Sequence, residues 1–475
     1  MREQGHRKER RGGTDHRRGA FAVFLLLLPA LLSGCSRKPS TPPNVLLITI
    51  DTLRSDRVGA YGGASTRTPA IDRLAREGTL FTEAYSSIPI TLPSHTSILT
   101  GLYPRTHGVL SHGFTLDDEH RTLAQILKEN GYQTAAFVSS HVLDDKYGLA
   151  RGFDIYWERY NYGLQRINAL LSQEGQDVQV WALSDYIRDE LKEPYFLWVH
   201  WFFPHKPYEP PPPMERLYDP DPSSDLRADV PTLERVWLGD LALNEPMIER
   251  FRSLYDGEVS FTDLQLDRVL DRLRERGVLD HTLVFFTADH GEVLYEHDRY
   301  FGHDIMLYDQ SIRVPLIVRA PGTAPAGALS GTTVRNIDLA PTILDLLSIP
   351  PEKYPMEGRS FAPSLRGETQ EEAPVFAEVY PPKQDWKSLP RHAVRYGGWK
   401  WITVDGEEGG LLYDMDADPA EQEDRSGRDP ESLARMADML NAWMIQEGGA
   451  ATGFPELSEE EMERLRSLGY IGSGD

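Results

Sequence analysis

Carboxylate and imidazole side chains follow four apolar runs of the chain, each close to the point where the run ends. They are Asp51 after residues 45–50, His141 after 135–138, His200 and His205 after 196–199, and Asp289 with His290 after 283–286. Carboxylates and imidazoles bind divalent cations such as Ca²⁺, Mg²⁺, Mn²⁺ or Zn²⁺. Asp51, Asp289 and His290 therefore predict a metal site, provided that the fold brings them together.

Thr91 offers a hydroxyl group for covalent chemistry. It opens the run Thr91-Leu92-Pro93-Ser94-His95-Thr96-Ser97-Ile98-Leu99-Thr100-Gly101, in which a helix is expected to begin just after Thr91. The unpaired backbone N–H groups of that helix would face an anion held near the hydroxyl. A free alcohol is a poor nucleophile near neutral pH, but coordination to a dication stabilises its alkoxide. Thr91 is thus a candidate nucleophile and metal ligand; the alternative is a threonine that only hydrogen-bonds near the helix start.

The four apolar runs alternate with stretches of helical pattern. Residues 122–130 end at Gly131, and residues 258–276 end at Gly277, as helices commonly do. Alternating strands and helices predict an α/β fold with a central, mostly parallel sheet flanked by helices. Ligands bind such sheets beyond the carboxyl ends of the strands, which is where the Asp and His residues fall. The proline-rich stretch 209–222 must be a loop, either a wall of a substrate groove or plain surface.

The C-terminal part of the chain changes character. Short β runs at 393–396 and 399–404, a turn at 406–410 and a helix near 431–444 predict a small α+β subdomain. Ser458 is placed to cap a charged helix that ends near Leu468, which we expect to be a surface appendage. The expected domains are a catalytic domain at 44–370, the C-terminal subdomain at 371–447 and the helical tail at 448–475.

The N-terminus carries targeting signals. Residues 1–34 hold seven Lys or Arg against three Asp or Glu, and the apolar run 20–32 is typical of a secretory signal peptide. Leu32-Ser33-Gly34-Cys35 resembles a bacterial lipobox, in which Cys35 is lipidated; a signal anchor with a chance cysteine is the alternative. Residues 35–43 would then tether the protein to a membrane of the cell envelope, on the periplasmic or extracellular face.

The charge of the chain limits its partners. Removing residues 1–34 takes away a net charge of +4 and moves the chain from −23 to −27. So acidic a protein does not suit nucleic acid. A small anionic substrate would need a local cationic pocket or a metal to bind.

Several blocks of the chain resemble the sulfatase family, a branch of the alkaline phosphatase superfamily. They are Ile50-Asp51-Thr52-Leu53-Arg54 through Ala60-Tyr61-Gly62, the run from Thr91, Gly101-Leu102-Tyr103-Pro104-Arg105-Thr106-His107-Gly108-Val109, Phe203-Pro204-His205-Lys206-Pro207-Tyr208, Asp289-His290-Gly291-Glu292 and Leu411-Leu412-Tyr413-Asp414. The resemblance covers most of the chain. It implies the sulfatase fold, hydrolysis of sulfuric or phosphoric esters, and a divalent cation, for which the family favours Ca²⁺.

The resemblance fails at the catalytic device of that family. Sulfatases oxidise a Cys or Ser at the position of Thr91 to formylglycine, and a threonine has no such route, so no formylglycine is expected. The signature Arg is His95, the usual Gly-Lys is Val138-Ser139, and Thr52 stands where many sulfatases have a second metal-binding Asp. Superfamily members with a Thr nucleophile include phosphodiesterases and phosphoryl transferases, which favours phosphate or phosphonate esters over sulfate esters.

The resemblance also implies roles for further side chains. His205 would contact the anion or protonate the leaving group, and His141 would line the same pocket. His95, His303 and Lys206 would contact the substrate, although His303 fits a second-metal ligand or a buried structural residue as well. Three other functions remain: a true sulfatase, a transferase acting on headgroups, and a binding lipoprotein that has lost its chemistry.

Overall fold

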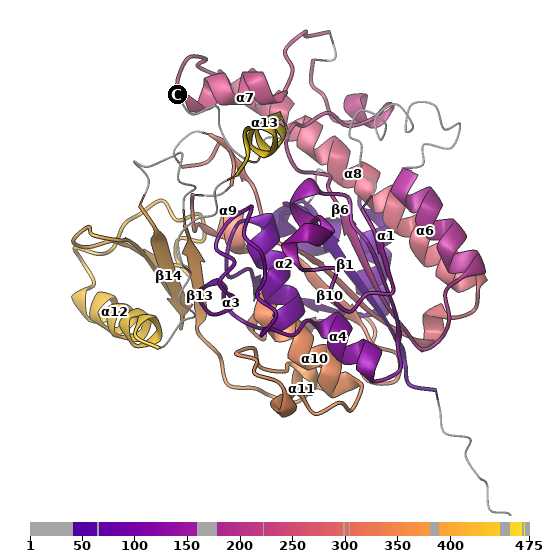
Figure 1. Ribbon diagram of the computed structural model, residues 1–475. Helices are drawn as coiled ribbons and strands as arrows, with labels where there is room; N and C mark the ends of the chain where they lie inside the picture. The colour runs from indigo at the N-terminus through magenta and orange to yellow at the C-terminus, as the bar shows by residue number, and fades with distance from the viewer. Residues whose placement is uncertain are drawn as a thin grey trace, which may run out of the picture. The chain divides into compact units, whose positions relative to one another are not determined.

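The largest sheet runs through eight strands in the order β11-β2-β10-β7-β1-β6-β4-β5 (Figure 1). Its strands are β1 Asn44–Ile50, β2 Thr79–Phe81, β4 Gln133–Phe137, β5 Ile155–Trp157, β6 Tyr195–Trp201, β7 Thr282–Ala288, β10 Leu316–Arg319 and β11 Ala328–Ser330. β10 is antiparallel to both of its neighbours, whereas the other pairings in the sheet are parallel. The mostly parallel sheet confirms the predicted fold.

The computed structural model describes residues 41–63, 66–158, 178–221, 223–297, 300–303, 305–380, 389–446, 457–467 and 470. The expected signal peptide at 1–34, Cys35 and most of the expected tether at 35–43 lie outside the described residues. Residues 41–475 belong to one compact unit. Within its described part, no helix combines the length and apolar character needed to cross a membrane.

Two groups of helices cover the sheet (Figure 1). One consists of α1 Pro69–Glu77, α6 Val178–Asp189 and α8 Glu245–Glu275, and the other of α2 Thr91–Thr100, α4 Leu123–Glu129 and α10 Leu339–Leu346. Every residue of β1, β6 and β7 is buried, because both faces of these central strands are covered. This double burial explains why these strands appear in the sequence as continuous apolar runs.

Helix α8 begins well before the expected start at residue 258. Asn244 caps it, accepting a hydrogen bond from the Met247 N–H at 3.1 Å. Gly257 lies inside this helix, where a Cβ atom would come within 2.8 Å of the Met214 carbonyl oxygen. The glycine therefore serves close packing against the proline-rich loop. It does not break the helix.

A separate four-stranded antiparallel sheet forms the C-terminal subdomain, in the order β13-β14-β15-β16. Its elements are β13 Val375–Val379, β14 Arg391–Tyr396, β15 Trp399–Val404, β16 Leu411–Asp414 and the covering helix α12 Pro430–Met444. One face packs on α12 through Val394 and Trp443. The other face packs on Tyr85, Ile88 and Ile90, which directly precede α2. The subdomain thus supports the start of α2.

A buried ion cluster joins this subdomain to the main sheet region. Lys400 Nζ lies 2.8 Å from Asp309 Oδ1 and 2.7 Å from Glu421 Oε1, and the lysine side chain is fully buried. The Asp309 N–H also donates to Glu421 Oε2 at 2.7 Å. Two buried carboxylates therefore share one ammonium group, while the charges of Arg395 and Arg313 also act on Asp309.

Lys400→Met is expected to lower the free energy of unfolding by about 3–5 kcal/mol, because it removes the ammonium group that pairs with both buried carboxylates. Urea unfolding followed by tryptophan fluorescence measures the loss. Lys128→Met is the matched control, since Lys128 pairs with Asp154 at the surface and should cost less than about 1 kcal/mol. Equal losses in the two variants would contradict the role of the buried cluster.

Candidate functional site

Four of the sequence-predicted residues meet at the carboxyl edge of the central strands. The Thr91 hydroxyl oxygen lies 3.4 Å from Asp51 Oδ1 and 3.3 Å from His290 Nε2. Candidate ligand atoms of Asp51, Asp289 and His290 all lie within 4.8 Å of one another. All four side chains are fully buried.

Strand register explains why the two carboxylates meet. β1 and β7 are neighbours with Ile50 opposite Ala288, so Asp51 and Asp289 leave the sheet side by side. Thr52 turns the chain with a φ of 57°, and its N–H donates to Asp289 Oδ1 at 3.2 Å. Thr91, the first residue of α2, brings the hydroxyl to the same place from another layer.

The electrostatics of this group fit a cation. No Lys or Arg among the described residues forms an ion pair with Asp289, although this carboxylate is fully buried. Burial raises the pKa of Asp289 to about 7, because an uncompensated carboxylate is costly away from water. Its Oδ2 atom is buried and receives no hydrogen bond among the described residues. Oxygen atoms from two carboxylates and one imidazole nitrogen make a site that can bind a divalent metal ion.

Three imidazoles near this group are oriented in the same way. In each ring, Nδ1 bonds a protein acceptor: His290 to the Gly291 carbonyl at 2.9 Å, His205 to the Lys206 carbonyl at 2.6 Å, and His303 to Glu292 Oε2 at 2.8 Å. In the neutral ring, Nδ1 then carries the hydrogen and Nε2 carries a lone pair. The ring of His303 lies 4.5 Å from that of His290 and 5.0 Å from that of His205, centroid to centroid. The site therefore presents several electron-pair donors to a cation or a proton.

Glu292 is a functional candidate whose role the sequence left open. Its carboxylate accepts from His303 Nδ1 and also from the Tyr208 hydroxyl at 2.6 Å. A carboxylate behind an imidazole fixes the ring and raises its basicity. The nearest signal in the sequence is the position of Glu292 directly after Asp289-His290-Gly291.

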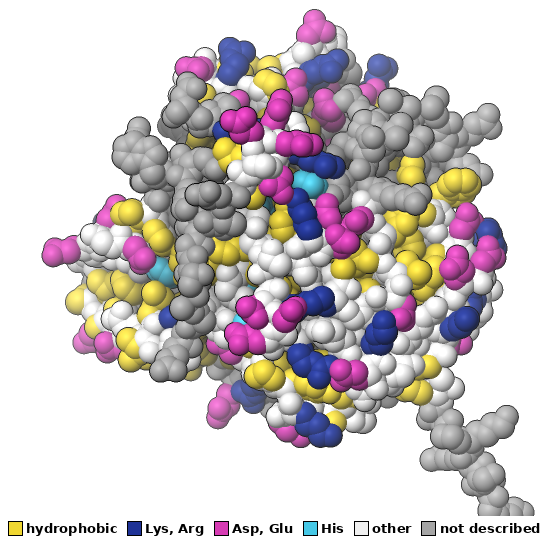
Figure 2. All heavy atoms as spheres, viewed as in Figure 1, with side chains coloured by type: hydrophobic (Ala, Val, Ile, Leu, Met, Phe, Trp, Pro, Cys, Tyr) yellow, Lys and Arg dark blue, Asp and Glu magenta, His cyan; other side chains and the backbone are white. Residues whose placement is uncertain are grey.

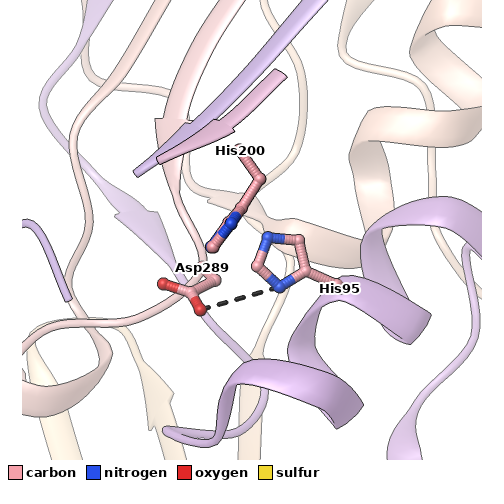
Figure 3. Close-up of side chains that lie close together, drawn as sticks. All are labelled: His95, His200 and Asp289. Carbon is pink, nitrogen blue, oxygen red and sulfur yellow. Dashed lines mark ion pairs between the residues drawn. The ribbon is translucent and has the colours of Figure 1, made fainter. Parts of the chain in front are cut away.

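His95 and His200 lie close to Asp289 (Figure 3). His95 Nδ1 bonds the Thr91 carbonyl at 2.8 Å, and its Nε2 bonds the Thr49 hydroxyl at 2.9 Å. Burial lowers the pKa of His95 to about 4, so the ring is neutral. We expected His95 to contact the substrate, but the structure directs both of its nitrogens to protein atoms. This corrects the expectation: His95 supports the backbone of Thr91, one helical turn away.

His200 approaches the same carboxylates from the end of β6. Its Nε2 lies 3.7 Å from Asp51 Oδ2, while the Ser139 N–H donates to its Nδ1 at 3.4 Å. His95, His200 and Asp289 have ligand atoms within 4.8 Å of one another. Because His95 already uses both nitrogens, Asp51, Asp289 and His290 are the better set for a cation.

Lys206 and His141 lie beside this centre. A Cβ atom on Gly302 would come within 3.0 Å of Lys206 Nζ, so the ammonium lies next to the backbone that leads into His303. His141 is buried, and its Nδ1 lies 3.7 Å from Asp144 Oδ2. Burial, together with the charges of Arg464 and Lys146, lowers the pKa of His141 to about 4. These contacts place His141 by the tail helix.

The fold and the site define a hydrolase of the alkaline phosphatase superfamily. A family model described as Sulfatase matches residues 43–349, and one described as N-sulphoglucosamine sulphohydrolase, C-terminal, matches residues 296–446. The first match spans more than half of the chain. The chain belongs to the sulfatase family. The relatives and solved structures that it matches are enzymes that hydrolyse sulfate or phosphonate esters.

Individual proteins agree with this assignment. Choline-sulfatase from Rhizobium meliloti is 27% identical over 463 residues, which cover 86% of this chain and 88% of that protein. A crystal structure of phosphonate monoester hydrolase from Agrobacterium radiobacter superposes with a TM-score of 0.71 at 24% identity, covering 88% of this chain and 98% of that one. A structure in complex with its substrate D-glucosamine-2-N,6-O-disulfate has a TM-score of 0.70 at 22% identity and covers 85% and 97%. The two structures support the fold.

Proposed function

We propose that this enzyme hydrolyses phosphate or phosphonate esters with Thr91 as its nucleophile. One observation carries the proposal: the only side-chain oxygen of Thr91 lies within 3.4 Å of Asp51 and 3.3 Å of His290, inside the candidate metal group. When bound there, a divalent cation supplies positive charge that stabilises the alkoxide form of the threonine. The first turn of α2 begins at Thr91, so its unpaired N–H groups can receive the anionic ester.

The reaction balances in two steps. The Thr91 hydroxyl gives its proton to water, and its oxygen attacks phosphorus. The bond from phosphorus to the organic oxygen then breaks, and the departing alcoholate takes up a proton. Water then attacks the phosphorus of the threonine ester, releases inorganic phosphate or phosphonate and restores the hydroxyl. A threonine sulfate would require the same water attack at sulfur, since it lacks the collapse to an aldehyde open to a formylglycine hydrate. This difference favours phosphorus over sulfur.

His205 is the proposed acid for the departing alcoholate or a contact to the anion. Burial, the neighbouring His303 and the ammonium of Lys206 hold the pKa of His205 well below its usual range. The free enzyme therefore has a neutral His205, which cannot donate through Nε2. A bound anion reverses this balance, because a nearby negative charge raises the pKa of an imidazole. His303, held by Glu292, and Lys206 are the proposed further contacts to the anion.

A panel of aryl esters tests this function. The purified full chain is assayed with a phosphate monoester, a phosphate diester, a phosphonate monoester and a sulfate ester, each with EDTA or with added Ca²⁺, Mg²⁺, Mn²⁺ or Zn²⁺. We expect kcat/KM for the best phosphorus ester to exceed that for the sulfate by at least about tenfold, a difference of about 1.4 kcal/mol in transition-state binding. EDTA should abolish the activity. Faster turnover of the sulfate would overturn the preference for phosphorus.

A true sulfatase is the second candidate, favoured by the names of its relatives. Choline-sulfatase and the Clostridium perfringens arylsulfatase, 26% identical over 440 residues, are both named for sulfate esters. The same panel of esters also tests the two remaining functions. Products carrying the phosphoryl group on an added alcohol would indicate a transferase, and inactivity on every ester would indicate a binding protein. The attachment to a bacterial envelope membrane through Cys35 also remains a proposal, supported by the lipobox-like run 32–35.

A further inference from the structure

Tyr470 lies against the candidate catalytic histidine, although the tail was expected to be a surface appendage. Its ring packs on His205 with centroids 4.6 Å apart, and on His112 at 4.9 Å. Its hydroxyl bonds the Ser140 hydroxyl, one residue before His141. Only 2% of Tyr470 is exposed. A side chain from the tail thus packs directly on one of the predicted catalytic residues.

The segment before Tyr470 is held to the main domain at several points. Helix α13, Glu459–Ser467, is capped by Ser458, whose hydroxyl accepts from the Glu461 N–H at 3.3 Å. Most of its acidic side chains face outward (Figure 2). On its inner side, Leu465 is buried and Glu461 pairs with Lys146 at 2.6 Å. Gly113 leaves room for Leu457, since a Cβ atom there would lie 2.5 Å from Leu457 Cδ2. These contacts hold the tail helix on the main domain next to Tyr470.

We propose that Tyr470 is a specificity-determining wall of the substrate site, so that the enzyme accepts esters with small organic groups. This inference rests on the proposed function, in which His205 faces the departing alcoholate. The organic group must then lie next to His205, and Tyr470 occupies one side of that imidazole. Phe202 packs on the same imidazole, with ring centroids 4.6 Å apart, and lies 6.1 Å from the ring of Tyr470. A bulky organic group would have to displace this aromatic pair.

A size series of substrates tests the proposal. Methyl, phenyl and naphthyl esters of the preferred acid are compared in the wild type and in Tyr470→Ala, Tyr470→Leu and Tyr470→Phe. In the Ala and Leu variants we expect the ratio of kcat/KM for the naphthyl ester to that for the methyl ester to rise about tenfold, mainly through KM. Tyr470→Phe keeps the ring and should keep the wild-type ratio within about twofold. A wild-type ratio in a folded Ala or Leu variant would overturn the proposal.

A second measurement does not depend on turnover. Diethyl pyrocarbonate acylates neutral imidazoles, and peptide mass spectrometry follows the modification of His205, with exposed His281 as internal reference. We expect the rate at His205 to rise about tenfold in Tyr470→Ala and to stay unchanged in Tyr470→Phe, because the ring shields the imidazole. An unchanged rate in Tyr470→Ala would refute the wall whatever the activity. Faster modification in a protein that hydrolyses no ester would instead refute the proposed function and keep the packing role.

Discussion

Replacing Thr91 with alanine is expected to abolish ester hydrolysis while metal binding persists. Loss of an essential nucleophile should lower kcat by roughly 10³-fold or more. Asp51, Asp289 and His290 remain in that variant, so metal content measured by mass spectrometry should match the wild type. Thr91→Ser keeps a hydroxyl at the same position and should keep measurable turnover. Acid quenching during wild-type turnover should also trap a phosphorylated Thr91 peptide.

Thr96→Ala provides the matched control for this substitution. Thr96 lies in the same buried helix, but its hydroxyl donates to the Leu92 carbonyl at 2.8 Å. Loss of that bond should leave kcat within about twofold of the wild type, because the hydroxyl bonds only within the helix. Substantial hydrolysis by Thr91→Ala would eliminate the covalent mechanism and leave water as the direct attacking group.

Asp51→Asn is expected to be more stable than the wild type without metal, less stable than the wild type with metal, and much less active. At pH 8, above the raised pKa of Asp289, that buried carboxylate is charged in the metal-free wild type, and replacing the neighbouring Asp51 carboxylate by an amide should raise the melting temperature by about 2–5 °C. With added metal the order should invert, since only the wild type gains the full binding free energy. Turnover should fall by at least about 10²-fold. Thermal melts with EDTA and with each cation measure both effects.

The control is a buried carboxylate that is not a candidate metal ligand. Asp338 pairs with Arg335 through two bonds to its guanidinium, at 2.7 and 3.0 Å. Asp338→Asn should lower the melting temperature with and without metal, because it leaves Arg335 uncompensated, and its response to metal should equal that of the wild type. A wild-type metal response in Asp51→Asn would show that Asp51 is not a ligand.

Much of the fold and the central site could be predicted because their signals are local. Buried parallel strands give uninterrupted apolar runs, and the residue after each run identifies the edge of the sheet, as at Asp51 and Asp289. The start of α8 was predicted too late in the chain, because a glycine such as Gly257 usually lowers the helical tendency of a segment. Its contact with the Met214 carbonyl, which explains the glycine, appears only in the folded structure. The sequence suggested a substrate contact for His95. Its bond to the Thr91 carbonyl becomes visible only once both residues are placed in the same helix. Tyr470 carries no local signal, because its partner His205 is remote in the sequence.

The face of the C-terminal sheet that packs on Tyr85, Ile88 and Ile90 has a consequence for inactivation. Those three residues lead directly into α2, so the position of Thr91, the proposed nucleophile, should depend on the small sheet staying docked. Local opening of one structural unit costs less free energy than global unfolding. On gentle heating, catalysis should therefore fail through partial detachment of the subdomain before the main sheet melts.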